Sequence, residues 1–357
     1  MHTNDVFALY LTGTKVDADG NPIAISKKPP VITSTQFPST DTQLQEVNDF
    51  AQSYGYTIDD LDAMAIELKT SWVDAATLTE TELPKYVLSQ AVVPVFDRSN
   101  PKKWTVKDNE TKTLALVGMH VVGSVNSHPE LIWSTFEHVD NVPDATYTYT
   151  TTSGSGQVKF DSAGTWTFTP SNAPMPTTIT SDAAVATDGS GAIESQNDLD
   201  IGPVTNVRAY PWGNDEDPKS PFCLQDKSLC SKTALKTAIE NTTDLVSINV
   251  SVLSQLAEGD IRGNYIQTGG IWTSMGQVPA QTSTDQNPQY DSDLRGSLNL
   301  ANSTMETFYQ FYNGPKNFNP KNCFGCHSLS EGQNDVEVSH IYDELLPLPE
   351  LGNVYKK

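Results

Sequence analysis

Hydrophobic and polar residues alternate along much of the first half of the chain, and this pattern predicts β-strands. Apolar and polar side chains alternate over 64–73, and a second strand is expected at 86–95. The segment 114–125 is almost wholly apolar, which predicts a strand buried on both faces. Residues 131–139 are rich in aromatic and β-branched side chains. They are expected to pair with the preceding strand as an antiparallel hairpin over 114–139, joined by a long loop.

Helical periodicity is confined to shorter stretches of the chain. Residues 5–13 and 44–54 each carry apolar side chains at helical spacing. Ser231 and Thr243 stand where N-caps are expected, so two further helices are predicted, one after each of them. A last helix is expected over 304–314, just before the C-terminal tail.

These elements divide the chain into five segments. They are 1–60, a helical and loop segment; 61–144, a β core with the hairpin 114–139; 145–200, a β insertion rich in Thr, Ser and Gly; 201–300, a loop, two helices and a strand; and 301–357, a helix and a tail. A chain of 357 residues is long enough to bury a sizeable core. We therefore expect an α+β fold, a β-dominated mixed fold with an antiparallel sheet and a few short helices.

The composition narrows the classes of function. Asp and Glu number 44 against 22 Lys and Arg, which gives a formal net charge of -22. This charge repels phosphate backbones and anionic lipid headgroups, so nucleic-acid binding is not expected. No stretch approaches the roughly 20 apolar residues of a membrane-spanning helix, so no integral membrane segment is expected. The abundance of Thr, Ser, Asn and Gln is typical of an exported, loop-rich β protein.

A motif near the C-terminus carries specific chemistry. The run Cys323-Phe324-Gly325-Cys326-His327 has the CxxCH spacing of covalent c-type haem attachment. In such sites two thiols add to the haem vinyl groups, and the adjoining imidazole binds the iron from the same side. The spacing predicts haem c as the cofactor, attached by Cys323 and Cys326, with His327 as the proximal iron ligand.

Two other uses of the motif cysteines remain open at this point. CxxC spacing also occurs in half of a zinc site and in redox disulfides. No second CxxC or close pair of histidines completes a tetrahedral set. A redox motif is expected at the start of a helix after an early strand, rather than near the C-terminus. Haem is therefore the favoured interpretation.

The position of the motif excludes the small all-helical cytochrome c fold. In that fold the motif lies near the start of the domain, whereas only residues 328–357 follow it here. Upstream residues must therefore form the haem pocket and supply any second axial ligand. The main candidates for the distal ligand are His120, His138 and His340; His128, Met119, Met175, Met275 and Met305 are weaker candidates.

The identity of the sixth ligand decides between functions. Two strong axial ligands favour electron transfer, whereas an open position allows peroxide, oxygen or nitric oxide to bind. In the open case, His120 or His138 would act as the distal acid or base, with Glu137 beside the latter. Such acids at strand ends are more often solvated. Arg262 and Arg295 are candidates to pair with the haem propionates, and a surface role is the alternative for each.

The cysteines also bear on the compartment. Attachment of haem c requires an oxidising compartment, so a periplasmic or extracellular location is expected. There Cys223 and Cys230 are expected to form a disulfide, with free thiols as the alternative. The residues after Met1 are polar and include no basic stretch, so no signal peptide is visible. The sequence is therefore expected to be a mature or shortened form.

Several sequence blocks resemble a known family. The blocks LALVGMHVVGS, LIWSTFEHVDNVPDA, NYIQTGGIWT and LANSTMETF, followed by CFGCH, resemble a poorly characterised cytochrome c family of exported bacterial monohaem proteins, over most of residues 60–330. The resemblance implies that His120 and His138 belong to the family pattern, together with Asn302, Thr304, Glu306 and Thr307. The hairpins expected over 145–170 have no counterpart in that family. The resemblance implies haem and export, and no established reaction.

These observations lead to one expected function and two alternatives. We expect an exported monohaem c-type cytochrome that transfers electrons in the periplasm or at the cell surface. Its acidic composition predicts a basic redox partner protein. The first alternative is a haem enzyme or gas-binding protein with an open distal site, similar to a peroxidase or an oxygenase. The second is a structural protein that its haem stabilises.

Overall fold

The computed structural model describes most of the chain. The described residues are 1–14, 32, 34, 36–174, 183–196, 198–202, 206–208, 232–274, 276–280, 294–297, 300–306, 322–329 and 335–342. Within them, three α-helices accompany a large antiparallel sheet: α1 (Asp5–Thr14), α2 (Asp41–Ser53) and α3 (Lys232–Leu253). The expected α+β, β-dominated fold is therefore confirmed, and the fold is not an all-helical bundle.

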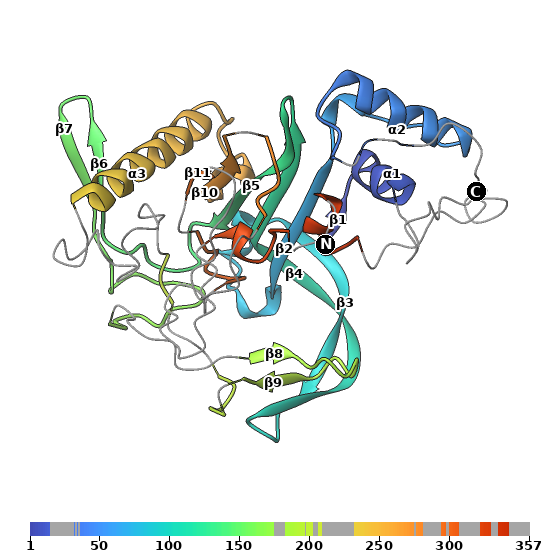
Figure 1. Cartoon of the computed structure of the whole chain (residues 1–357). Coiled ribbons are helices and arrows are strands. Elements are labelled where there is room, and N and C mark those ends of the chain that lie inside the picture. Colours follow the sequence, from blue (N-terminus) through green and yellow to red (C-terminus); the bar gives the residue numbers. More distant parts are fainter. Residues whose placement is uncertain are drawn as a thin grey trace.

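One sheet of nine strands dominates the described part of the fold (Figure 1). Its strands are β1 (His2–Thr3), β2 (Ile66–Asp74), β3 (Leu88–Asp97), β4 (Lys103–Val125), β5 (His128–His138), β8 (Ala183–Val185), β9 (Ile193–Ser195), β10 (Tyr265–Thr273) and β11 (Leu294–Gly296). The main path runs β1-β2-β4-β5-β10-β11, and each pairing along it is antiparallel. The strands expected at 64–73 and 86–95 are confirmed.

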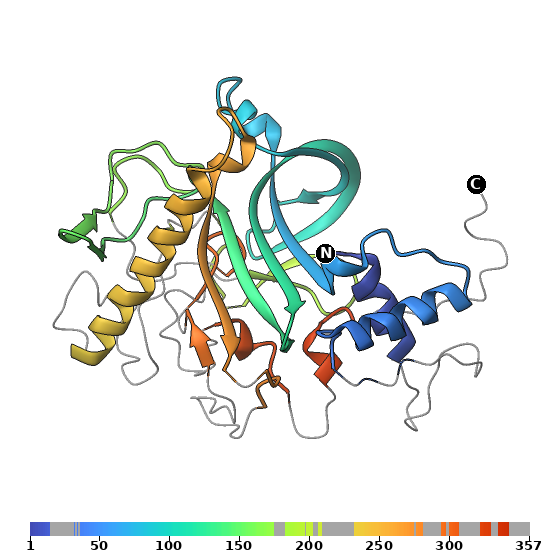
Figure 2. The ribbon, with the colours of Figure 1, turned by 90° about the horizontal axis from the view of Figure 1, so that it is seen from above.

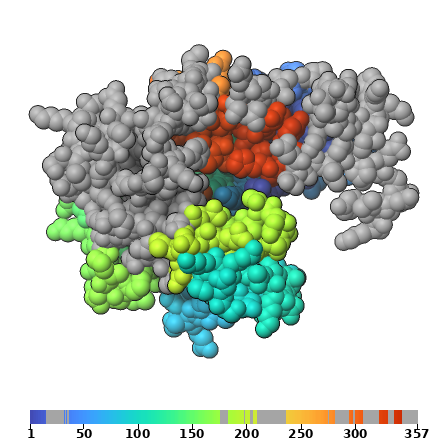
Figure 3. Space-filling model, turned by 60° about the horizontal axis from the view of Figure 1, so that its bottom comes forward, coloured from blue at the N-terminus to red at the C-terminus, as the bar shows by residue number. Residues whose placement is uncertain are grey.

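Strand β4 is much longer than the apolar segment that predicted it. Its second half contains the buried run 115–118, which lies along β2, with Ala115 also paired to β3 and Gly118 to β5, so burial on both faces is confirmed there. Its first half, 103–113, is mostly exposed and pairs with β3 as a two-stranded arm. Strand β9 pairs with β8 and with Lys103 and Trp104 of this arm. Figure 3 shows β8 and β9 in yellow-green beside the arm.

The hairpin of β4 and β5 is confirmed, but its connection is tighter than expected. Val125 pairs with His128, so the turn consists of Asn126 and Ser127 alone. Ser127 has a φ of 69°, a left-handed conformation that two-residue hairpin turns use. The expectation of a long loop rested on Pro129, which lies inside β5 instead. A register shift directly after the turn accommodates the proline, as a β-bulge commonly does.

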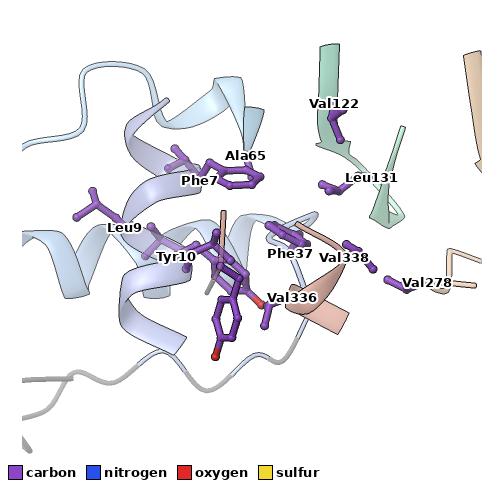
Figure 4. Packing of buried hydrophobic residues seen from close by; sticks show 14 of the residues in the cluster. Phe7, Leu9, Tyr10, Phe37, Ala65, Val122, Leu131, Val278, Val336 and Val338 are labelled. Carbon is purple, nitrogen blue, oxygen red and sulfur yellow. The ribbon is translucent and has the colours of Figure 1, made fainter. Parts of the chain in front are cut away.

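Helices α1 and α2 pack beside the β2 end of the sheet, and α3 lies beside the β10 end (Figures 1 and 2). The side chain of Asn4 accepts the N–H of Phe7 at 3.0 Å and so caps α1. The ring of Phe37 lies 5.2 Å from the rings of Phe7 and Tyr10. Figure 4 shows these rings in one hydrophobic cluster with Val338 of the C-terminal segment. This core holds the C-terminal segment against the sheet.

Helix α3 is continuous, whereas two helices were expected in this region. The expected cap at Thr243 lies inside the helix. Its hydroxyl donates to the carbonyl of Ile239 at 2.6 Å, one turn back, so it does not cap a second helix. The same oxygen accepts the N–H of Thr150 at 2.8 Å. Thr150 belongs to β6 (Tyr147–Thr151), so this contact ties α3 to the hairpin that β6 forms with β7 (Gly154–Val158).

Other expected elements are described only in part. The β6–β7 hairpin confirms strand structure within the predicted insertion 145–200 and forms a separate two-stranded sheet. The helix expected over 304–314 is described only to Glu306, and the described residues of it form a turn. Ser231, the other expected cap, lies outside the described residues. Among the described helices, none has the length and apolar character needed to span a membrane.

Candidate functional site

The CxxCH motif forms a tight turn that a buried phenylalanine anchors to the sheet. Residues Cys323–Gly325 form a 3-10 turn, which Asn322 caps by accepting the N–H of Phe324 at 3.0 Å. Phe324 is fully buried, and its ring meets the ring of Trp133 edge-on, with 6.0 Å between centroids. Neither Cys323 nor Cys326 forms a disulfide within the described residues. The sheet therefore determines where the two thiols lie.

The imidazole of His327 is held by one nitrogen, and the other keeps its lone pair. Nδ1 lies 2.7 Å from the backbone carbonyl of Val338. Because a carbonyl oxygen only accepts, Nδ1 carries the hydrogen and Nε2 presents the lone pair. The ring packs 4.3 Å from that of Trp133 and stacks 4.0 Å from that of His340. Burial, together with His340, lowers the pKa of His327 to about 3, so the ring is neutral at pH 7, the form that binds metals.

A cavity of about 360 Å³ lies between the motif turn and one face of the sheet. Cys323, Cys326 and His327 line it, as do His340 and parts of the segment 300–306. The volume falls within the range of about 300–1,000 Å³ that is usual for cofactor and ligand sites. In Figure 3 the red C-terminal segments, which carry the motif, reach the molecular surface.

The register of the sheet explains which side chains form the floor of the cavity. Lys69 on β2 pairs with His120 on β4. Two residues further along, Glu67 pairs with Val122, and Val122 pairs with Trp133 on β5. Residues two apart on a strand point to the same face of a sheet. The floor is therefore made of two adjacent cross-strand rows. One consists of Glu67, Val122 and Trp133, and the other contains Lys69 and His120.

His120 is the hairpin histidine that lines the cavity. Its Nε2 lies 2.8 Å from Oε1 of Glu306, and Nζ of Lys69 lies 3.7 Å from the same oxygen. Nδ1 of His120 is buried and has no hydrogen-bond partner within the described residues. Burial acts to raise the pKa of Glu306, but the attraction of His120, its hydrogen bond and Lys69 outweigh burial. The net result is a pKa below the ordinary value, so Glu306 is a charged acceptor.

The turn that carries Glu306 is fastened to the sheet. The second carboxylate oxygen of Glu306, Oε2, accepts the backbone N–H of Asn302 at 3.0 Å. The Asn302 side chain donates to the hydroxyl of Thr135 on β5 at 2.8 Å. A Cβ atom at Gly118 would lie only 2.4 Å from Oγ1 of Thr304, so glycine allows the turn to sit this close to β4. The position of the carboxylate is therefore set by several independent contacts.

A buried ion-pair network lies beside this turn. Glu137 is fully buried and accepts the N–H of Ser303 at 2.7 Å and Nε of Arg208 at 3.2 Å. Arg208 is 2% exposed and also donates to Asp144 at 2.9 Å and to the carbonyl of His138 at 3.0 Å. No local motif marks this arginine in the sequence, so it was not among the predicted residues. Glu137, expected from its position at a strand end to be solvated, instead neutralises the buried guanidinium.

His138 lies outside the cavity, although the sequence made it an equal candidate for the distal ligand. Its ring is fully buried, stacks 3.7 Å from that of Tyr86 and meets that of Tyr265 edge-on. Nδ1 accepts the N–H of Asp140 at 3.2 Å, so Nε2 carries the hydrogen and donates to the carbonyl of Lys85 at 3.2 Å. Burial lowers the pKa of His138 to about 4. Both nitrogens are thus occupied by structural contacts.

Of the remaining predicted site residues, His340 lies at the cavity, and Arg262 and Arg295 do not. His340 lines the cavity, but its ring touches that of His327, so it stands beside the proximal candidate and not opposite it. Arg262 is 74% exposed and pairs with Asp260 at 2.6 Å. Arg295 is exposed on β11. Neither arginine lines the cavity, whereas Lys69 does.

Two expectations involve residues beyond this site. Cys223 and Cys230, the predicted disulfide, lie outside the described residues. Within the described ranges, no three His, Cys, Asp or Glu side chains converge in a way that would hold a metal ion. A haem iron takes only one or two protein ligands, so this observation bears on a zinc cluster and does not bear on haem.

Three residues of the site were not proposed from the residue patterns. Lys69 and Glu67 belong to the alternating segment 64–73, which was interpreted only as a strand, with no role given to its charged positions. That alternation was the available signal, because both lie on one face of β2 and both line the cavity. Glu306 entered only through the family resemblance. No sequence signal connected it with His120, which is 186 positions away.

Comparison of the chain with protein-family models, with curated proteins and with solved structures gives no match in any of the three. The resemblance to exported monohaem proteins therefore rests on the sequence blocks alone. The geometry and chemistry of the site are therefore the grounds for its function.

Proposed function

We propose that the protein is an exported monohaem c-type cytochrome that transfers electrons. The observation that carries the haem proposal is the arrangement of His327. Its Nδ1 donates to the carbonyl of Val338, which leaves the Nε2 lone pair available beside a cavity that both motif thiols line. A metal-binding histidine usually donates its other N–H to a carbonyl or carboxylate in this way. The motif spacing and this hydrogen bond are independent of each other, and both favour haem c.

The two cysteines suit covalent attachment. Attachment adds each S–H across one vinyl double bond of the haem, which forms a thioether and needs no oxidant. Burial raises the pKa of the Cys323 thiol, so this sulfur carries its hydrogen. Cys326 is exposed. Both residues line the cavity, and so both sulfurs are placed to react with a haem that enters it.

The walls of the cavity suit a flat, largely apolar cofactor with an acidic edge. Val122 and Leu300 are buried side chains of the lining, and the ring of Trp133 lies beside them. Nε1 of Trp133 is buried without a hydrogen-bond partner in the described residues, and Lys69 supplies a cation. In this proposal, these two groups take the role with the propionates that was expected of Arg262 and Arg295.

The electron-transfer role is supported by exposure and charge. Cys326 and His340 are both exposed at the motif, so a haem attached here lies close to the surface, where a partner protein can approach it. The net charge of -22 favours a basic partner, and the rate of electron exchange should fall as ionic strength rises. Export to the periplasm or cell surface is part of the same proposal, because haem c is attached in oxidising compartments.

One observation favours a second candidate function, reaction of a small molecule at an open iron site. Nε2 of His120 is engaged by Glu306, and its Nδ1 is buried, so neither nitrogen is turned toward a metal in this arrangement. The pair instead places an acid and a base at the wall of the cavity. Peroxide, oxygen or nitric oxide is the kind of ligand that such a site would take.

The test is an absorption spectrum of protein matured in a host that attaches haem c, recorded oxidised, dithionite-reduced and then with carbon monoxide. We expect haem that resists acid extraction from the wild type. It should become extractable in the double variant Cys323→Ala, Cys326→Ala. His327→Ala should keep the covalent haem but change the iron bands.

His128→Ala is the matched control, because His128 is a partly exposed histidine outside the cavity. Its spectrum should equal that of the wild type. Reduced absorption bands that do not change with carbon monoxide support electron transfer. Bands that shift with carbon monoxide support an open iron site. Absence of covalent haem from the wild type contradicts both functions.

A further inference from the structure

We infer that Glu306 is the positioning residue of this pocket: its carboxylate fixes the ring of His120 and the nitrogen on which that ring carries its hydrogen. The inference rests on the proposed function for its consequences at the haem. The contact itself is a property of the protein alone. Glu306 would act through His120 and would not touch the iron.

The first support is the direction of the hydrogen bond. A carboxylate accepts and does not donate, so the 2.8 Å contact requires the hydrogen on Nε2 of His120. Nδ1 is then the acceptor nitrogen of the neutral ring, and it lies buried without a partner in the described residues. Within the part of the chain that the structure describes, no group on the Nδ1 side competes for the hydrogen. Glu306 therefore decides which form of the imidazole is present.

The second support is the surroundings of His120 on the sheet. Its cross-strand neighbour on β2, Lys69, can only donate and so cannot take the Nε2 hydrogen. Its neighbour on β5, Thr135, bonds to the side chain of Asn302 at 2.8 Å and makes no hydrogen bond to the ring of His120 in the described part of the chain. Within the described residues, the carboxylate of Glu306 is thus the acceptor that the structure provides for this ring.

The third support is that the carboxylate is itself held in place. One of its oxygens accepts the backbone N–H of Asn302, in the turn that leads to Glu306. That turn is fastened to β5 through the Asn302 side chain and sits over Gly118 of β4. A group that orients a site residue needs supporting contacts of this kind, because a mobile carboxylate would not select one ring orientation.

The consequence is the same for either proposed role of the haem. His120 lines the cavity in which the haem would lie, with its ring fixed and its Nε2 hydrogen donated to Glu306. Releasing the ring would change the groups that face a bound ligand or the iron. Loss of a partner that orients a metal-binding histidine typically costs about 10- to 100-fold in metal affinity or activity, and we expect an effect of similar size on ligands that bind beside His120.

The experiment uses the full chain, prepared both with and without attached haem, and ¹⁵N NMR of its histidines at about pH 9, above the ordinary titration range of histidine. His120→Gln identifies the His120 signals. In the wild type we expect hydrogen on Nε2 alone. In Glu306→Gln the amide can donate as well as accept, so we expect a mixture of the two tautomers.

Glu67→Gln is the matched control, since it removes the same charge from the same cavity while leaving the His120 contact intact. It should leave the His120 tautomer unchanged. In haem-loaded protein, cyanide affinity of the ferric iron should change by about 10-fold or more in Glu306→Gln.

The outcomes separate this inference from the proposed function. If no haem is attached, the proposed function fails, but the tautomer of His120 in the haem-free protein still decides the inference. If Glu306→Gln keeps the hydrogen on Nε2, or if both variants behave alike, the inference is wrong even when haem is present. Glu306→Asp provides a second variant that keeps the charge. Its shorter side chain should lose the 2.8 Å contact and release the ring, and an unchanged ring would overturn the inference.

Discussion

The two histidines of the central hairpin, His120 and His138, show how one sheet builds a site and a core from the same residue type. His120 lies on the face that carries the cavity and meets a charged carboxylate. His138 lies on the other face, between aromatic rings, and both of its nitrogens bond to backbone groups. Alternation along the two paired strands places them on opposite faces. The roles of the two histidines therefore depend on which face of the sheet each side chain occupies, and not on the residue type.

The same comparison extends to two glutamates, Glu306 within the segment 300–306 and Glu137, which contacts that segment. Glu137 is sealed against Arg208, a cation that stays charged at every accessible pH. Glu306 faces His120 beside a cavity. The first arrangement suits a permanent structural link, and the second leaves a group that can respond to a ligand. The sealed region is the buried pair of Glu137 and Arg208, and the open region is the pair of Glu306 and His120 beside the cavity.

The largest effect is expected from breaking the sealed region. Arg208→Ala would leave the carboxylate of Glu137 buried without its cation, which typically costs about 3–5 kcal/mol of unfolding free energy. Urea denaturation followed by fluorescence measures the loss. Arg262→Ala is the control, because its ion pair with Asp260 is on the surface and its removal should cost less than about 1 kcal/mol. Equal losses for the two variants would contradict the structural role of Arg208.

An intermediate effect is expected when the two histidines are exchanged for alanine separately. His138→Ala removes a buried ring and two hydrogen bonds, so it should lower stability by about 2–4 kcal/mol. His120→Ala should cost less than about 1.5 kcal/mol, because the ring borders the cavity and Glu306 keeps Lys69 nearby. If haem is attached as proposed, its absorption spectrum should change more in His120→Ala than in His138→Ala. A large spectral change in His138→Ala alone would reverse the assignment of the two faces.

The smallest effect concerns the pH dependence of stability. Burial lowers the pKa of His138 from 6.5 to about 4, so the unfolded chain binds more protons between these values. Stability should therefore fall as pH decreases, by about 2 kcal/mol from pH 7 to pH 5 for this residue. Urea denaturation at the two pH values tests this. The variant His138→Gln should lose that part of the dependence, and an unchanged slope would show that other groups carry it.

Much of the sheet could be predicted from the sequence, because strand patterns are local. The alternation over 64–73 and the apolar segment 114–125 both correspond to strands of the central sheet. The errors also have local causes. Pro129 indicated a loop but is accommodated inside β5, and Thr243 indicated a cap but bonds within α3. In each case the residue's usual local preference did not decide which element formed.

The sequence by itself determined the chemistry that is available, and the tertiary structure decided which groups meet. The CxxCH spacing is local, so the motif alone identifies the two thiols and the imidazole of His327. The separation of His120 from His138, the contact with Glu306 and the burial of Arg208 depend on strand register and on a turn packed over Gly118. These contacts join residues far apart in the chain, and a single sequence carries no local signal of them because their energies arise only when the sheet has formed.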